Sequence, residues 1–244
     1  MLNHNISDEF LISSETRSTT TKTRVLVHNQ QIARVDDETD GPISEAEEEA
    51  VMEQVRNVLT GVDAVVLSDY AKGCLTATLI ASVISESKKH GKMVLVDPKS
   101  RDFTKYSGAT LLTPNLLEAL TAAGVEKGGE ELAEQAASKI LSETSVGSLL
   151  ITLGEHGMKL FRPGEEAVHF PSLARQVFDV TGAGDTVVAL LASALGAKAG
   201  MNSAISFANI GAGIAVERVG TTIVRVDELR LAIDEHISHL PKDQ

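Results

Sequence analysis

The sequence predicts an α/β fold in which a mostly parallel, doubly wound sheet is covered by helices on both faces. Four short apolar runs, AVVLSDY, MVLVDPK, TLLTPN and SLLITLG, follow one another between residues 64 and 154. Segments with a helical spacing of apolar residues separate these runs, and fully apolar strands that alternate with helices are typical of parallel sheets. The chain has 244 residues, which is enough for one well-buried domain, so we expect a single domain over residues 1–244.

Other elements flank this central pattern. The stretch TRVLVHNQQIARVD has two β-rich runs that meet near Asn29 and Gln30, which predicts a hairpin over residues 19–36 with one exposed face. The acidic residues 36–50 predict a solvated loop and a helix start capped by Ser44. The stretch MKLFRPGEEAVHF predicts a second hairpin that turns at Pro163 and Gly164, and three helices are expected near 184–198, 202–217 and 226–237.

Charge and composition exclude several classes of partner. The formal net charge of -12 opposes nonspecific binding to nucleic acid or to anionic membranes. No apolar run approaches the roughly 20 residues that cross a bilayer, and the first residues have no secretory pattern. A lone cysteine, Cys74, excludes an internal disulfide and is expected to pack in the interior. We therefore expect a cytoplasmic protein with no nucleic-acid or membrane partner.

The stretch FDVTGAGDTVVALLASAL places small residues and an acid at the start of an apolar helix. A helix N-terminus carries about half a positive charge, and the turn formed by Gly182, Ala183 and Gly184 exposes backbone N–H groups, so the turn suits an anion. If that anion is a phosphoryl group in transfer, Asp185 is placed to accept a proton from the attacking hydroxyl. The same residues are also typical of a tight helix entry whose acid interacts with the helix dipole.

A second group follows the apolar run at TPNLLEAL. Asn115 and Glu118 are three residues apart and therefore share one face of the first helical turn. An amide and a carboxylate in this arrangement can orient water around a magnesium ion that bridges phosphates. They are equally typical of a capping box, in which Asn115 caps the helix and Glu118 reaches back to it.

Two weaker signals lie at other strand ends. Gly154 and Gly157 in ITLGEHGMKL would let a nucleotide approach the backbone closely, although a hairpin entry also needs glycine. Charged residues gather after the first two strands, and they either hold a phosphorylated substrate or form an ion-pair network. These charged residues are Asp69, Lys72, Asp97, Lys99 and Arg101.

Taken in order, LSDYAKG, VDPKSRDFTKYSGATLLTPNLLEA, ITLGEHGM, DVTGAGDT and ANIGAGIAVERVGT resemble the ribokinase-like (PfkB) carbohydrate kinases. The resemblance covers the chain from about Thr19 onward and is greatest to the branch that phosphorylates heptose 7-phosphate in ADP-heptose synthesis. It implies a ribokinase-like fold, ATP and Mg²⁺ as cofactors, and a sugar phosphate as substrate. It also implies that the hairpin is a small β lid, through which two copies of the chain can pair as a homodimer.

The resemblance also implies roles for individual residues. Asp185 is the expected catalytic base, and Gly182, Ala183 and Gly184 form the expected anion hole. The expected ATP-binding residues are Asn115, Leu116, Leu117, Glu118, Thr152, Gly154, Gly157 and Asn209, of which Asn115 and Glu118 lie at the metal. Lys72 and Lys99 are the expected contacts of the sugar phosphate.

The chain departs from the family pattern at its start. Family members begin with further strand and helix units that carry a glycine pair gripping the sugar, and nothing before TTTKTRV matches them. We therefore expect a kinase domain that lacks its N-terminal portion. Another sugar kinase of the family and a noncatalytic nucleotide-binding remnant are the alternative interpretations.

Overall fold

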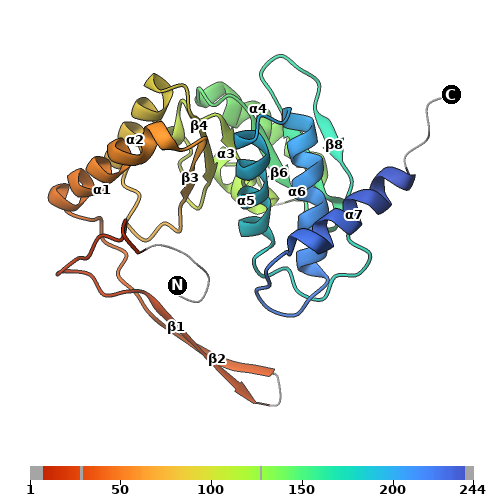
Figure 1. Cartoon of the computed structure of the whole chain (residues 1–244), viewed down its shortest axis with the longest axis horizontal. Coiled ribbons are helices and arrows are strands. Elements are labelled where there is room, and N and C mark those ends of the chain that lie inside the picture. The colour runs from red at the N-terminus through yellow and green to blue at the C-terminus, as the bar shows by residue number, and fades with distance from the viewer. Residues whose placement is uncertain (1–7, 28–29, 127, 240–244) are drawn as a thin grey trace.

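A six-stranded sheet in the order β3-β4-β5-β6-β7-β8 forms the centre of the protein (Figure 1). The structure is a computed structural model that describes residues 8–27, 30–126 and 128–239. The first four strands run parallel, β7 pairs antiparallel with β6, and β8 pairs antiparallel with β7. Their bounds are β3 (Ala64–Ser68), β4 (Met93–Asp97), β5 (Leu111–Leu112), β6 (Leu149–Thr152), β7 (Met158–Phe161) and β8 (Val168–Phe170). The predicted α/β fold with a mostly parallel sheet is confirmed.

Helices cover both faces of the sheet. One face packs on α1 (Glu45–Val58), α2 (Ala77–Lys89), α3 (Leu116–Ala123) and α4 (Ala133–Glu143), and the other on α5 (Ala183–Gly196) and α6 (Met201–Val216). Strand side chains alternate between the two cores, since Val94 and Val96 join the first and Leu95 joins the second. The helix α7 (Val226–His239) packs on α6. Short 3₁₀ turns lie at Leu59–Gly61, Thr104–Tyr106, Glu130–Leu132 and Gly154–His156.

The predicted hairpin is present as a separate two-stranded ribbon. Strands β1 (Thr21–Val27) and β2 (Gln30–Asp37) pair antiparallel, and the ribbon extends below the body (Figure 1). The turn near Asn29 falls on residues 28–29, which lie outside the described residues. Every residue of β1 is exposed, so the expectation of a single exposed face is wrong. A two-stranded ribbon cannot bury both of its faces by itself.

Local signals in the sequence account for several element ends. Ser44 caps α1 in a complete capping box, as expected from the acidic stretch that contains it. Gly124 ends α3 in the left-handed region at φ 60°. Cys74 is exposed, so the expectation that it packs in the interior is wrong. Among the described residues, none of the helices combines the length and hydropathy that crossing a membrane requires.

Candidate active site

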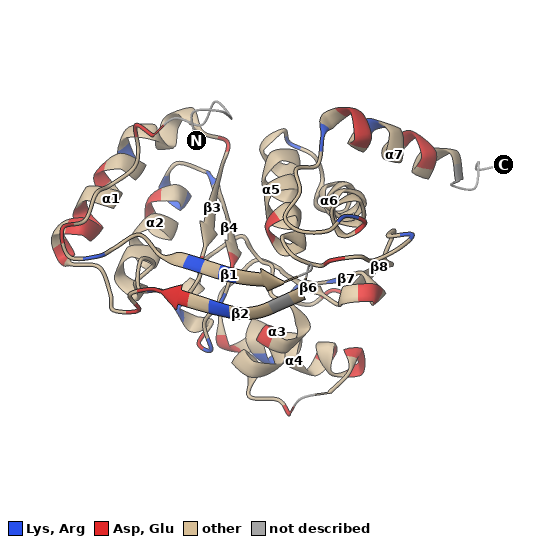
Figure 2. Cartoon of the chain, turned by 90° about the horizontal axis from the view of Figure 1, so that it is seen from below, with Lys and Arg blue, Asp and Glu red and all other residues tan. Residues whose placement is uncertain are grey.

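A cavity of about 820 Å³ lies at the carboxyl ends of the parallel strands. Its walls come from the segments that follow β3, β4, β5 and β6 and from the first turn of α5. Open α/β sheets bind ligands at this edge because the strand ends and the following helix starts converge there. The base of the ribbon β1–β2 contacts the loop that follows β3 through Lys72 and Glu38. Figure 2, which views the molecule from below, shows the ribbon crossing in front of the body.

The entrance to α5 forms one wall of the cavity. Gly182 is the N-cap at φ 81° and has no side chain to cap the helix, while a Cβ added to Gly184 would meet no atom within 4 Å. The turn before the helix is held by Asp179, whose Oδ1 accepts from the Thr181 N–H at 2.9 Å and whose Oδ2 accepts from the Gly220 N–H at 2.9 Å. The hydrogen bonds from Thr181 lower the pKa of Asp179. The first turn of α5 thus faces open space with no side-chain cap, as an anion site requires.

Asp185 lies in that first turn and meets a tyrosine from across the cavity. The Tyr70 hydroxyl donates to Asp185 Oδ1 at 3.1 Å. Burial, and then the negative charge of Asp185, raises the pKa of Tyr70. Sequence reasoning did not select Tyr70, although it directly follows the strand-end residue Asp69 and so stood at a position where ligand contacts are common.

Asn115 and Glu118 form the predicted capping box at the start of α3. The Glu118 N–H donates to Asn115 Oδ1 and the Asn115 N–H donates to Glu118 Oε2, both at 2.9 Å. Lys99 adds an ion pair, with Nζ 2.6 Å from Glu118 Oε1, and this hydrogen bond raises the pKa of Lys99. All three residues line the cavity, so the capping box leaves them facing the site.

Two aspartates at strand ends complete the acidic floor of the cavity. Burial and then the negative charges of Glu118, Asp185 and Asp69 raise the pKa of Asp97 to about 6, although Lys99 opposes them. Asp69 is 4% exposed and accepts from Lys105 Nζ at 2.7 Å and from the Tyr106 hydroxyl at 2.5 Å. Burial acts to raise the pKa of Asp69, but these hydrogen bonds outweigh it and hold the pKa below its usual value.

The residues expected to bind the nucleotide include several in the segment that begins at the end of β6. Thr152 pairs with Asn115 in an isolated bridge, which joins the two predicted ATP-binding segments. Gly157 has φ 89°, and a Cβ there would lie 2.1 Å from the Phe170 carbonyl oxygen, so only glycine fits. Asn209 is 6% exposed, and its Nδ2 donates to the Pro171 carbonyl at 2.7 Å. These residues line the cavity, as does Gly154.

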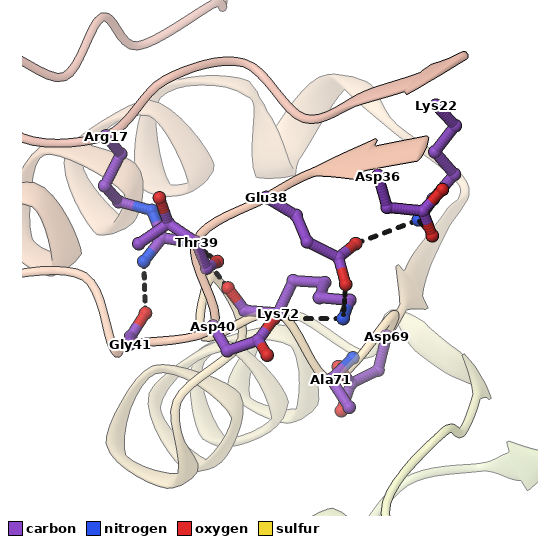
Figure 3. Close-up of polar contacts among 10 residues, drawn as sticks. All are labelled: Arg17, Lys22, Asp36, Glu38, Thr39, Asp40, Gly41, Asp69, Ala71 and Lys72. Atoms are coloured by element: carbon purple, nitrogen blue, oxygen red, sulfur yellow. Dashed lines mark hydrogen bonds and ion pairs between the residues drawn. The ribbon is translucent and has the colours of Figure 1, made fainter. Parts of the chain in front are cut away.

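Four predicted residues are not brought to the cavity, and one of them is the exposed Arg101. Lys72 instead forms ion pairs with Glu38 and Asp40 at the base of the ribbon (Figure 3). Leu116 packs against the core on the side of α1 to α4, and Leu117 is 53% exposed. The lysine therefore belongs to an ion-pair network, which was the alternative interpretation of the strand-end charges.

The cavity has a marked excess of negative charge. Its lining includes five carboxylates and one lysine, namely Asp69, Asp97, Glu118, Glu155, Asp185 and Lys99. Within the described residues, no three His, Cys, Asp or Glu side chains converge as a metal cage would require. An anionic ligand would therefore need its own cations here, in addition to the α5 N-terminus and Lys99.

Known proteins that share one name are similar to this chain over most of its length. The chain is 43% identical over 238 residues to "Bifunctional protein HldE" of Desulfatibacillum aliphaticivorans, which covers 97% of this chain and 49% of that protein. It is 47% identical over 231 residues to the protein of the same name from Caulobacter sp. (strain K31), covering 94% of this chain and 47% of that protein. The chain thus spans about half the length of the curated relatives it matches.

Solved structures share the fold at lower sequence identity. Ribokinase from Giardia lamblia superposes with a TM-score of 0.72 at 22% identity, covering 91% of this chain and 73% of that one. Arabidopsis thaliana ribokinase, complexed with ribose and ATP, gives a TM-score of 0.71 at 22% identity, covering 89% of this chain and 70% of that one. The model of the pfkB family carbohydrate kinases matches residues 2–228, which extends the match to before Thr19. The chain belongs to the pfkB family of carbohydrate kinases, which are phosphotransferases that act on sugars.

Proposed function

We propose that this kinase transfers the γ-phosphoryl group of ATP to the anomeric 1-hydroxyl of D-glycero-β-D-manno-heptose 7-phosphate, giving the 1,7-bisphosphate for ADP-heptose synthesis. The observation that carries the proposal is Asp185 in the uncapped first turn of α5, facing a large cavity at the sheet edge. The resemblance of the whole motif set to the heptose branch of the family supports this choice of sugar. Another sugar phosphate of similar size is the alternative substrate within the family.

The proposed transfer is direct and in line. The anomeric oxygen forms a bond to the γ-phosphorus while the bond from that phosphorus to the bridging oxygen of ADP breaks, so ADP leaves. Asp185 takes the hydroxyl proton through the carboxylate oxygen that Tyr70 does not occupy. The N–H groups near Gly182, Ala183 and Gly184 stabilise the charge on the transferred group, since they are fixed before the reaction begins.

We propose that the nucleotide arrives with Mg²⁺. The excess of carboxylates in the cavity disfavours a bare triphosphate, and a divalent cation would offset that repulsion. Asn115 and Glu118 are the residues proposed to hold it. Both oxygens of Glu118 already accept hydrogen bonds, so contact through the ion's own waters fits this site better than a closed set of protein ligands.

We propose that the ribbon β1–β2 is a lid and that two copies of the chain pair through it. Its exposed apolar side chains include Val25 at 44%, Leu26 at 59%, Ile32 at 64% and Val35 at 61%. A two-stranded ribbon with such faces is marginal in water unless something covers it. Replacing Val25 and Val35 with lysine should therefore convert a dimer into monomers in light scattering, and an unchanged mass would contradict the pairing.

The test of the function is ADP release from ATP with a panel of sugar phosphates. We expect turnover with heptose 7-phosphate to exceed that with the other sugars, and faster turnover of another sugar would reject the heptose assignment. Asp185→Asn should keep ATP binding and lose most turnover, while Asp234→Asn, an exposed change on α7, should behave like the parent. ATP binding without any sugar-dependent ADP release would instead identify a noncatalytic nucleotide-binding protein.

A further inference from the structure

The loop of residues 69–73 connects the cavity to the base of the ribbon, and one of its residues reaches Asp185. Tyr70 is 58% exposed, yet its hydroxyl lies 3.1 Å from Asp185 Oδ1. This hydrogen bond joins two walls of the cavity at the proposed base, since Asp185 belongs to α5 and Tyr70 follows β3. A donor at one oxygen fixes the carboxylate plane and leaves the other oxygen for the substrate hydroxyl.

The inner end of the loop is anchored in the protein interior. Besides the bonds from Lys105 and Tyr106, Asp69 Oδ1 accepts from the Ala71 N–H at 2.7 Å, and the Asp69 N–H donates to the Asp97 carbonyl at 3.0 Å. Ala71 lies in the left-handed region at φ 53°, which is a strained conformation for a residue with a Cβ. Strained backbone of this kind persists where surrounding contacts fix it, and it concentrates at functional sites.

The outer end of the loop is fixed to the ribbon base. The Arg17 guanidinium donates to the carbonyls of Lys72 and Gly41, and Lys72 Nζ is paired with Glu38 (Figure 3). Gly73 packs backbone to backbone against Gly41, because a Cβ at Gly73 would lie 1.9 Å from the Gly41 carbonyl oxygen. The loop that carries Tyr70 is thus held at both ends.

We infer that Tyr70 is a positioning residue that orients Asp185 for proton transfer, held in place by the anchored loop 69–73. This inference rests on the proposed role of Asp185 as the base. It explains why Ala71 has a strained backbone and why Lys72 forms ion pairs, although neither residue lines the cavity. The expected cost of removing the hydroxyl is about ten-fold in kcat, because a hydrogen bond to a charged group is lost while the base itself remains.

The kinetic test uses Tyr70→Phe with ATP and heptose 7-phosphate. We expect kcat to fall about ten-fold with the KM of both substrates unchanged, since only the orientation of the base is lost. A kcat within two-fold of the parent would overturn the inference, and so would a raised KM for the sugar with kcat unchanged, which would make Tyr70 a binding contact. Asp185→Asn, measured in parallel, distinguishes failure of the Tyr70 inference from failure of the proposed function. If Asp185→Asn keeps nearly full activity, Asp185 is not the catalytic base.

A second measurement needs no turnover. The chain has two tyrosines, and Tyr70→Phe identifies the contribution of Tyr70 to the ultraviolet titration of phenolate by subtraction. Because the charge of Asp185 raises the pKa of Tyr70, the Tyr70 titration should move to lower pH in Asp185→Asn. Circular dichroism over the same pH range confirms that the fold persists. An unmoved titration would show that the contact is absent and would overturn the inference.

Discussion

Asp97→Asn should stabilise the protein at alkaline pH, although it removes a charged residue from the candidate site. The pKa of Asp97 is about 6 in the folded chain against an ordinary value of 3.8, because burial and then the charge of Glu118 disfavour the carboxylate. Above pH 6 the folded state therefore carries a charge that the unfolded state solvates better. The free energy of unfolding should fall as pH rises from about 4 to about 7.

The size of the effect follows from the shift. Two pKa units correspond to about 3 kcal/mol, and solvent screening of this partly exposed side chain reduces the expected gain to about 1–2 kcal/mol. Urea unfolding of the parent and of Asp97→Asn at pH 4.5, 6 and 8 measures it. The variant should be more stable at pH 8, and the difference should shrink toward pH 4.5, where the folded parent is mostly protonated.

Asp102→Asn provides a control of opposite sign. Hydrogen bonds from Thr104 lower the pKa of Asp102, so its charged form stabilises the fold above pH 4. This variant should be less stable than the parent at pH 8. The reasoning about Asp97 is refuted if Asp97→Asn is the less stable protein at pH 8, or if its advantage does not change with pH.

Three further predictions concern stability and are checked by urea unfolding at pH 7. Asp69→Asn leaves its partly buried lysine partner without a counter-charge and should cost about 3 kcal/mol, whereas Arg56→Ala breaks an exposed ion pair and should cost far less; equal losses would contradict this. Gly157→Ala should cost more than about 3 kcal/mol, because its Cβ would overlap a carbonyl oxygen. Gly164→Ala should cost only about 1 kcal/mol, because Gly164 has φ 76° but its Cβ would meet no atom within 4 Å. Lys198→Gly should gain about 1 kcal/mol, since Lys198 follows the C-cap of α5 and has φ 67°, and a loss of stability would show that its side chain has a structural role.

The periodic parts of the fold were predictable because burial repeats along the chain. Val94, Leu95 and Val96 are apolar in succession since each face of their strand meets a helical layer, and this continuous run indicated a parallel strand. The same reasoning placed Asp97 and Asn115 at one edge of the sheet, because the carboxyl ends of parallel strands converge there.

The contacts that depend on distant partners were not predictable. Lys72 pairs with Glu38, which lies 34 positions earlier, and no local pattern distinguishes such a lysine from one that faces a substrate. Tyr70 meets Asp185 across 115 positions, so its selection required the arrangement of β3 and α5 in space. The exposure of both faces of β1 likewise depends on which elements pack nearby rather than on its own alternation.

The backbone contact between Gly73 and Gly41 also couples the base of the ribbon to the loop after β3. Since the two chains touch without intervening side chains, the segment around Gly41 cannot swing unless the loop after β3 moves with it. Any displacement of the backbone at Gly41 is therefore passed on to Gly73 and to the loop that carries Tyr70. The ion pairs of Lys72 with Glu38 and Asp40 add a second link between the same two segments.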